Sequence, residues 1–402
     1  MRDMVPTLEF DERFMQRPHE TYRRLREQRP VQQVVLPRGT KVWVVTRYAD
    51  VRALLTDSRL SKDVRNAGEL FDRHAANGAV RTELRQSLGA HMLNSDPPDH
   101  TRLRKLVNKA FTSRTVERLR PRVEHITEEL LDDMAGNDEV DLLESLAFPL
   151  PITVICELLG IPQGDRDDFR AWSNVIVSAG GQDELGEASA KMAGYLVELI
   201  KRKRRQPADD LLSELVHAKE DRDQLTDTEL TSMAFLLLVA GHETTVNLIG
   251  NGMLALLRHP EQLVELRADR SLLPGAIEEF LRYEGPVHLA TFRYTTEPLR
   301  LDEAEIGAGQ FVMLSLLSAN RDPDRFEDAD GLDIRRPAGG HVAFGHGIHY
   351  CVGAPLARLE AEIAIGRLLD RFPELTLARQ PETLVWRDSA IMRGLATLPI
   401  QL

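Results

Sequence analysis

The chain contains the run Phe344-Gly345-His346-Gly347-Ile348-His349-Tyr350-Cys351-Val352-Gly353, in which one thiol and three glycines follow a leading aromatic residue. Glycine adopts backbone angles that other residues avoid, and it lets the backbone approach a ligand closely. The residues after Gly353 favour a helix, so Cys351 lies just before a helix N-terminus. The unpaired N–H groups and the helix dipole at that position favour a thiolate over a thiol. We expect this segment to hold its backbone against something large and flat.

A thiolate at Cys351 can act as a nucleophile, as a zinc ligand or as an axial ligand of haem iron. The zinc alternative is weakened because no second thiol lies nearby and because three histidines stand too close to Cys351 for a usual tetrahedral site, namely His341, His346 and His349. A nucleophile would need a general base oriented by a third group, and the sequence leaves that alternative open. The other cysteine, Cys156, lies in an apolar run and is predicted to be plain core.

The cysteine run resembles the haem-binding loop of the cytochrome P-450 superfamily, Phe-Gly-x-Gly-x-His-x-Cys-x-Gly, and every fixed position is filled. The resemblance implies that Cys351 is the proximal ligand of the iron of haem b, in a loop shaped by Gly345 and Gly353. It also implies that Phe344 lies near the sulfur and that His349 reaches a haem propionate. The implied fold is mainly α with small β-sheets, a triangular helical prism with haem between a long distal helix and the proximal cysteine loop.

A long helix is predicted upstream of this loop. Thr226 and Glu229 have the spacing of a capping box, and helix-compatible sequence continues to Arg258 before a proline. At 1.5 Å per residue this helix would be roughly 45–50 Å long. Its apolar middle is interrupted by Gly241-His242-Glu243-Thr244-Thr245, which is destabilising unless these polar groups have a use. The alternative is a salt-bridged Glu243 beside threonines that bond back to earlier carbonyls.

Residues 240–244 resemble the oxygen-binding groove of the cytochrome P-450 distal helix, Ala/Gly-Gly-x-Asp/Glu-Thr. The resemblance implies that Ala240 contacts the cofactor and that Gly241 permits a local kink where dioxygen sits. Thr244 would hydrogen-bond the oxygen, and Glu243 would relay protons from solvent. The chemistry requires such groups because O–O cleavage needs protons in a pocket that is otherwise dry.

Glu279 and Arg282 form a Glu-x-x-Arg motif, which taken alone is compatible with a surface ion pair worth under about 1 kcal/mol. The resemblance implies a structural pair that supports the cysteine loop. The superfamily usually adds a second arginine in a Pro-x-Arg-Phe run, but Gly331 stands where that arginine is expected. The sequence leaves open whether Arg325, Arg335 or Arg336 completes the network, or whether this loop is less rigid than usual.

Haem carries two propionates, which need cationic partners when they are partly buried. His100 and Arg104 match the superfamily motif His-x-x-x-Arg. The resemblance implies that Arg293 and His349 add a third and a fourth anchor. The alternative for each of these residues is an ordinary surface cation.

The 402 residues carry a formal net charge of −12, which argues against nucleic acid as a partner. Two cysteines in a chain of this length indicate a reducing compartment rather than a disulfide scaffold. Neither a secretory signal nor an uninterrupted apolar run long enough for a bilayer is recognisable. No linker divides the chain, so we expect a single domain over residues 1–402, in a cytoplasmic monomer that does not enter a membrane.

Short strands are predicted beside the helical body. A helix over residues 19–28 precedes strands over 31–35 and 41–46, which a Pro-Arg-Gly turn would join into a hairpin. Further strands are predicted over 289–294 and 311–314.

A monooxygenase of this kind needs two electrons, but the chain lacks the cysteine cluster of an iron–sulfur protein and has no appended reductase. The resemblance therefore implies separate partners, a ferredoxin and an NAD(P)H-dependent ferredoxin reductase. An acidic ferredoxin would dock by electrostatic steering on cations around the thiolate face, namely Arg102, Arg104, Lys105, Lys109 and Arg358.

The substrate pocket implied by the resemblance draws on segments 70–93, 175–181, 237–240, 287–291 and 391–392, which are mainly apolar. The residues expected to line it are Leu93, Val175, Leu237, Val239, Val287, Leu289, Ala290, Ile391 and Met392. Several segments of the sequence resemble actinobacterial macrolide hydroxylases, so we expect one oxygen atom of O2 to be inserted into a C–H bond of a macrolide or similar natural product. A steroid or vitamin D-type sterol is the second expectation. Alternatives of another kind are a non-catalytic haem sensor or docking module, and a peroxide-driven enzyme.

Overall fold

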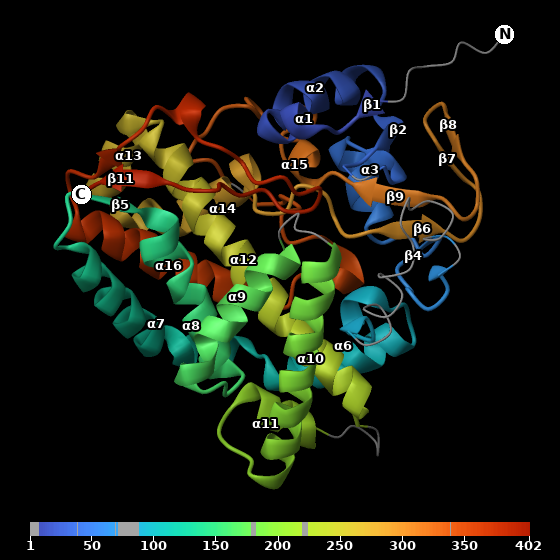
Figure 1. Cartoon of the computed structure of the whole chain (residues 1–402). Helices are drawn as coiled ribbons and strands as arrows, with labels where there is room; N and C mark the ends of the chain where they lie inside the picture. The colour runs from blue at the N-terminus through green and yellow to red at the C-terminus, as the bar shows by residue number, and fades with distance from the viewer. Residues whose placement is uncertain are drawn as a thin grey trace.

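The computed structural model describes residues 8–37, 39–68, 70, 88–177, 182–218, 224–337 and 339–402. Helices form a broad body with a triangular outline, and a small sheet lies at one corner (Figure 1). The mainly α fold with small sheets is the one predicted. The long helix α12 (Asp227–Leu257) runs through the middle of the body and packs against α8 (Pro149–Leu158), α10 (Gln182–Arg205), α14 (Leu273–Glu284) and α16 (Ala354–Arg371).

The capping box predicted at the start of α12 is present. The Thr226 side chain accepts a hydrogen bond from the Glu229 backbone, and the Glu229 carboxylate accepts one from the Thr226 backbone. Among the described residues, α12 is the helix whose length and composition would allow it to cross a bilayer, and 67% of its most apolar window is buried inside the protein. Burial of most of its surface accounts for this apolar sequence, because a helix in the middle of a large core needs little polar face.

The remaining helices of the body surround α12. They include α6 (Asp99–Ala110), α7 (Ser113–Met134), α9 (Arg166–Val177), α11 (Leu211–His217) and α13 (Pro260–Ala268). Leucine, isoleucine and valine side chains from α7, α8, α12, α14 and α16 share one large apolar cluster. Cys156 is fully buried in this cluster, and burial raises the pKa of its thiol to about 12, as expected for plain core.

The six-stranded sheet has the strand order β1-β2-β3-β9-β6-β4. Its strands are β1 (Leu8–Glu9), β2 (Val31–Val35), β3 (Lys41–Val45), β4 (Leu60–Ser61), β6 (Arg293–Thr295) and β9 (Phe311–Leu314). The predicted hairpin is confirmed, since β2 and β3 pair antiparallel with Val34 opposite Val42.

The strand predicted over residues 289–294 begins later than expected. Leu289 forms only an isolated bridge to Ser315, and the regular strand starts at Arg293. In between, the carbonyl of Thr291 accepts a hydrogen bond from the Arg293 guanidinium, 3.2 Å away. The side chain of Arg293 thus satisfies a backbone group that a neighbouring strand would otherwise pair.

Short helices flank the sheet, namely α1 (Glu12–Gln16), α2 (Pro18–Gln28), α3 (Tyr48–Leu54) and α15 (Leu316–Ala319). The helix predicted over residues 19–28 is therefore present, one residue longer. A second sheet joins β5 (Glu139–Asp141), β10 (Thr376–Leu377) and β11 (Pro399–Gln401), and β7 (Leu299–Leu301) pairs with β8 (Ala304–Ile306).

Candidate functional site

The cysteine loop is closed by its own backbone. The Gly345 N–H donates to the Val342 carbonyl at 2.8 Å, and the Cys351 N–H donates to the Phe344 carbonyl at 2.9 Å. Gly345 and Gly347 have φ of +76° and +74°, which only glycine adopts without strain. A Cβ on Gly347 would also lie 2.5 Å from the methyl of Thr56. Backbone conformation and close packing within this region thus explain why positions 345 and 347 of the motif are glycines.

Cys351 follows this loop and precedes α16. Its side chain has accessible surface although it lies deep in the fold, and this desolvation raises the pKa of the thiol. The backbone N–H groups of Gly353 and Ala354 and the cations Arg104 and Arg358 oppose the rise. The N-terminus of α16 therefore favours the thiolate as expected, but in the protein alone it does not outweigh burial. A metal ion removes such a proton by coordination.

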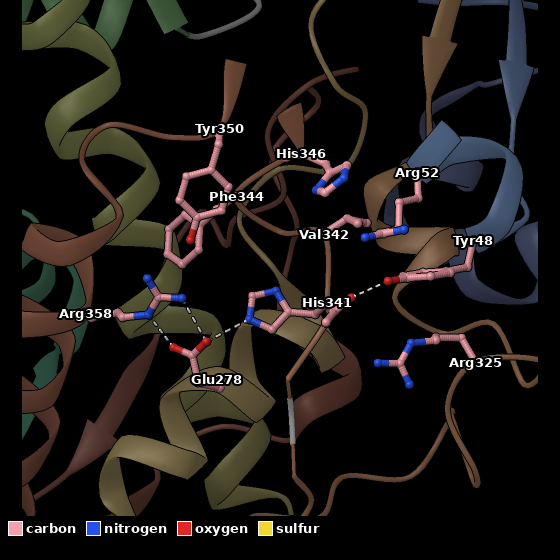
Figure 2. A pocket seen from close by; sticks show the side chains of 12 residues that line it. Tyr48, Arg52, Glu278, Arg325, His341, Val342, Phe344, His346, Tyr350 and Arg358 are labelled. Atoms are coloured by element: carbon pink, nitrogen blue, oxygen red, sulfur yellow. Dashed lines mark hydrogen bonds and ion pairs between the residues drawn. The ribbon is translucent and has the colours of Figure 1, made fainter. Parts of the chain in front are cut away.

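A charged buttress supports the aromatic residue of the motif. The guanidinium of Arg358 lies over the Phe344 ring, 4.5 Å from its centroid, and is paired with Glu278 of α14. His341 contacts the same carboxylate at 3.0 Å (Figure 2). The two partners lower the pKa of Glu278 to about 2 despite partial burial, so its carboxylate stays ionised. Phe344 is thereby fixed next to the loop that carries the thiol.

Six basic side chains gather beside the cysteine loop, although they come from distant parts of the chain. We call them the basic cluster, and its members are Lys62, His91, His100, Arg104, Arg293 and His349. The rings of His100 and His349 meet with centroids 4.4 Å apart. The predicted anchors His100, Arg104, Arg293 and His349 are therefore brought together.

Burial and mutual repulsion act on the whole basic cluster. Burial first, then Lys62, His100, Arg293 and Arg104, lower the pKa of His349 to about 2. Burial lowers the pKa of Arg293 to about 10 and that of Lys62 well below its ordinary value, while Asp96 opposes both shifts. Such a group of buried bases is complementary to an anion that brings more than one negative charge.

Two members of the basic cluster, Lys62 and His91, were not predicted from the sequence. Lys62 is 4% exposed, and its ammonium group donates to the Thr291 hydroxyl. His91 is 5% exposed, and its Nδ1 has no hydrogen-bond partner among the described residues, as is also true of Nε2 of His100. Buried polar atoms without partners are rare in folded proteins, and a bound anion would give these two nitrogens an acceptor. Haem is a flat group with two carboxylates. It fits these residues, which lie beside the accessible thiol of Cys351.

The middle of α12 has a solvent-accessible strip. Ala240 is exposed, and Val239, Gly241 and Thr244 are half-buried, although neighbouring turns of the helix are buried. The Thr244 hydroxyl donates to the Ala240 carbonyl at 2.9 Å, so its lone pairs stay available as acceptors. This is the back-bonding that the structural alternative predicted, and it leaves the hydroxyl on the accessible strip.

Gly241 has a packing role in this structure. A Cβ there would lie 3.0 Å from Cδ1 of Ile155, so the glycine lets α8 approach α12. The helix α12 continues through Gly241, where the resemblance implied that a local kink is permitted. The close contact with α8 holds the two helices together here.

Glu243 is 2% exposed and pairs with Arg387, whose Nη1 lies 2.6 Å from its Oε1. Its neighbour His242 is neutral because burial lowers the pKa of the imidazole. His242 contacts the Leu238 carbonyl at 2.8 Å and the Ser173 hydroxyl at 3.0 Å, so both of its ring nitrogens are engaged. Arg387 was not predicted from the sequence.

Glu279 and Arg282 are fully buried and form a two-pronged ion pair, with both N–O distances at 2.7 Å. Arg282 also donates to the carbonyls of Asn320, Ala329 and Gly331. The surface-pair alternative is therefore excluded. The arginine left open by the sequence is Arg336, whose Nε lies 3.3 Å from Glu279 Oε1. Gly331 contributes its backbone carbonyl where the superfamily has an arginine.

The residues expected to line a substrate pocket differ in accessibility. Leu93, Val175, Val239, Val287, Ile391 and Met392 are half-buried, whereas Leu237 and Ala290 are buried at 6% and 7% exposure. Leu289 is 0% exposed because it packs in the apolar cluster around the N-terminal helices, so it offers no surface to a ligand. The expected segments over 71–87 and 178–181 lie outside the described residues.

Comparison with known proteins agrees with this geometry. The family model described as Cytochrome P-450 matches residues 18–170 and 181–392. Cytochrome P-450 107B1 of Saccharopolyspora erythraea is 55% identical over 394 residues, which cover 98% of this chain and 97% of that protein. Vitamin D(3) 25-hydroxylase of Pseudonocardia autotrophica is 49% identical over 392 residues, with 97% and 95% covered.

A solved structure, the tirandamycin C-bound P-450 monooxygenase TamI, superposes with a TM-score of 0.91 at 54% identity and covers 98% of this chain and 100% of that one. Matches of this length and identity, together with the cysteine loop, the basic cluster and the buried Glu279–Arg282 pair, leave one conclusion. The chain belongs to the cytochrome P-450 family and is a monooxygenase that uses haem b.

Proposed function

We propose that Cys351 is the axial ligand of the haem iron, and that the enzyme inserts one oxygen atom of O2 into a C–H bond of a bulky hydrophobic natural product of the macrolide or polyketide kind. The observation that carries the assignment is the contact between the rings of His100 and His349, whose centroids lie 4.4 Å apart. His349 lies in the cysteine loop two residues before Cys351, so the thiol and a site for carboxylates adjoin one another. Haem is a ligand with an iron atom at its centre and two carboxylates at its edge.

The cofactor, the basic cluster and the cysteine loop have separate roles in this site. When bound, haem with a thiolate ligand supplies oxygen activation and favours O–O cleavage. The basic cluster binds the two propionates, which restores charge balance among its buried bases. Gly345 and Gly347 shape the backbone of the cysteine loop, and Arg358 holds the Phe344 ring in place beside it.

Proton delivery is assigned to α12. Thr244 lies on the accessible strip with its hydroxyl free to accept, and Glu243 lies one residue before it, buried and ion-paired. A positioned acid is needed because a dry pocket has no bulk water to supply protons. The presence of both groups favours an O2-dependent enzyme over a peroxide-driven one and over a non-catalytic haem sensor or docking module.

The substrate proposal rests on apolar surface. The accessible residues near the site include Val239, Val287, Ile391 and Met392, which favour a large apolar ligand. The relative TamI has been solved with tirandamycin C bound, which supports a natural-product substrate. The name of the relative from Pseudonocardia autotrophica, a vitamin D(3) hydroxylase, supports a sterol as the second candidate.

Bacterial enzymes of this family take electrons from redox partner proteins. We propose a ferredoxin with its NAD(P)H-dependent reductase, working in the cytoplasm with a monomeric enzyme. A cavity of about 490 Å³ opens beside the cysteine loop and is lined by Arg52, Arg325, Arg358, His341 and Tyr350 (Figure 2). The cavity carries three arginines beside Glu278, so it suits the acidic surface of a ferredoxin. Among the cations first expected, Arg358 lines this cavity, whereas Arg104 is half-buried and Arg102 is paired with Glu229.

The assignment of Cys351 is tested by the absorption spectrum of the dithionite-reduced protein with carbon monoxide. A strongly red-shifted Soret band is expected for the wild type, and Cys351→Ser should lose it. Cys156→Ser is the matched control, because it removes the other thiol, which lies in the core. A band typical of histidine-ligated haem in the wild type, or an unchanged band in Cys351→Ser, would overturn the assignment. Spin-state shifts with macrolides and then sterols would identify the substrate class.

A further inference from the structure

The ion pair between Glu243 and Arg387 belongs to a longer contact. Residues 386–395, which we call the pocket loop, lie along one face of α12. Asn251 donates from Nδ2 to the Arg393 carbonyl at 2.9 Å. One turn earlier, Asn247 lies against Gly394, where an added Cβ would come within 1.9 Å of Asn247 Oδ1. Glu243, Asn247 and Asn251 are spaced four residues apart, so they share one face of the helix.

Within the pocket loop, Arg387 is held from behind. Its backbone N–H donates to the Gly394 carbonyl at 2.9 Å, and Trp386 pairs with Leu395 as an antiparallel bridge. The backbone of Arg387 is therefore hydrogen-bonded to Gly394, the residue that contacts Asn247. The backbone of Arg387 is thus fixed beside α12, within reach of Glu243.

The pair extends from the accessible surface into the core. The Arg387 side chain is 33% exposed and that of Glu243 is 2% exposed. Arg387 occupies one carboxylate oxygen, whereas the other, Oε2, is buried and has no hydrogen-bond partner among the described residues. One oxygen of the acid is thus fixed and the other is left for a proton or for water. The nearby base His242 is already engaged with Leu238 and Ser173.

The tip of the pocket loop carries the two residues expected to meet substrate. Ile391 and Met392 are half-buried. Met392 pairs with Val287 as an isolated bridge, and its N–H donates to the Ser389 hydroxyl at 3.1 Å. A ligand that displaces this tip would act on a loop whose base is Arg387.

We propose that Arg387 is a positioning residue for proton delivery, which fixes Glu243 through one carboxylate oxygen and ties that carboxylate to the loop that senses substrate. The proposal rests on the role given to Glu243 above. It predicts that substrate contact at Ile391 and Met392 and the placement of the acid on α12 are coupled through one side chain.

The test compares Arg387→Gln, which removes the charge, with Arg387→Lys, which keeps it. Arg379→Gln is the matched control, because Arg379 lies in the same C-terminal region and forms an exposed ion pair with Glu139. The probe is tirandamycin C with a ferredoxin system, and the readouts are product per NAD(P)H, peroxide formed and the solvent deuterium isotope effect. Infrared difference spectra against Arg387→Gln/Glu243→Gln report the carboxyl group without any turnover.

In Arg387→Gln, product per NAD(P)H should fall by about 10- to 100-fold and the solvent isotope effect should rise, because the acid is no longer fixed. A protonated-carboxyl band that depends on Glu243 should appear, since a buried carboxylate without its cation binds a proton. Arg387→Lys should recover most of the coupling, and Arg379→Gln should match the wild type.

An ionised Glu243 and unchanged coupling in Arg387→Gln would overturn the proposal, as would an equal loss in Arg379→Gln. If no variant and no wild type turns over the probe, the infrared band still decides whether Arg387 controls the carboxylate. The carbon monoxide spectrum reports separately on the proposed haem ligation, so the two proposals fail independently.

Discussion

Arg336 reaches the carboxylate of Glu279 from a loop 57 residues away, with its Nε 3.3 Å from Oε1. Glu279 therefore accepts hydrogen bonds from two arginines and from the backbone N–H of Asp333. A carboxylate with no exposed surface needs such partners, because an unpaired buried charge is strongly destabilising. The loop after α15 is joined in this way to α14, which carries the buttress of Phe344.

Substitutions of the adjacent residues Arg335 and Arg336 test this link between the loop and α14. Arg336→Ala should lower the free energy of unfolding by about 1–2 kcal/mol, because it removes a hydrogen bond to a buried charge. Arg335→Ala is the neighbouring control, because the Arg335 side chain is 60% exposed and its loss should cost under about 0.5 kcal/mol. Urea denaturation of the two variants gives the comparison, and equal effects would contradict the role of Arg336.

Thr244→Ala is expected to divert electrons to peroxide. The substitution removes the hydroxyl on the accessible strip of α12, so product per NAD(P)H should fall about 10-fold or more. Thr231→Ala is a matched control, since Thr231 makes the same bond to a carbonyl four residues earlier, at 2.8 Å, elsewhere in α12. Product formation that stays fully coupled in Thr244→Ala would exclude this role.

Glu360 of α16 is 1% exposed, and its carboxyl oxygens have no hydrogen-bond partner among the described residues. Burial raises the pKa of this carboxyl from 4.5 to about 8, with Thr245 opposing part of the shift. Unfolding then releases a proton between these two values, so stability is lost as pH rises from about 4.5 to about 8. Glu360→Gln should remove this loss and stabilise the protein by about 2–3 kcal/mol at neutral pH. Denaturation curves at several pH values would show the gap widening, and a constant gap would contradict the prediction.

The burial of His288 predicts the opposite dependence of stability on pH. Its imidazole contacts the Tyr22 hydroxyl at 3.0 Å, and burial, with Arg393 and His19, lowers its pKa from 6.5 to about 3. The unfolded chain binds a proton below pH 6.5 while the folded one does not, so stability falls on acidification by up to about 1.4 kcal/mol per pH unit. His288→Gln should reduce that slope. His125→Gln, at a position with 61% side-chain exposure, should leave the slope as it is in the wild type.

Charge reversal at Arg52 tests the partner surface. Arg52 is exposed on the cavity beside the cysteine loop, so Arg52→Glu should weaken binding of an acidic [2Fe–2S] ferredoxin about 10-fold at low salt. The difference should shrink as salt is added, because screening acts on exposed charges. Arg379→Glu reverses an exposed charge elsewhere, and equal weakening in that variant would exclude the cavity as the docking site.

Local spacing was sufficient for the parts of the fold that form within a few residues. The capping box of Thr226 and Glu229 and the hairpin of β2 and β3 depend on neighbours in sequence, and both were predicted. The cysteine loop also closes within itself, through the Cys351 bond to Phe344. Such features leave a pattern in the sequence because one turn of backbone decides them.

The missed residues meet partners far along the chain. Lys62 reaches Thr291 across 229 residues, and Arg387 reaches Glu243 across 144. Neither contact has a spacing rule, because only the packing of separate helices and strands brings its partners together. Gly241 illustrates the same limit, since its contact with Ile155 of α8 cannot be read from the neighbours of the glycine.

The basic cluster has a consequence for how the enzyme is made. Its six members come from the residue after β4, the loop before α6, α6 itself, β6 and the cysteine loop, so both halves of the chain converge on one group of repelling charges. Whatever neutralises them binds the folded chain and not the unfolded one, so its binding free energy adds to that of folding. The melting temperature of this enzyme should therefore depend on the concentration of free haem, and the haem supply of the host should determine how much of the newly made chain survives.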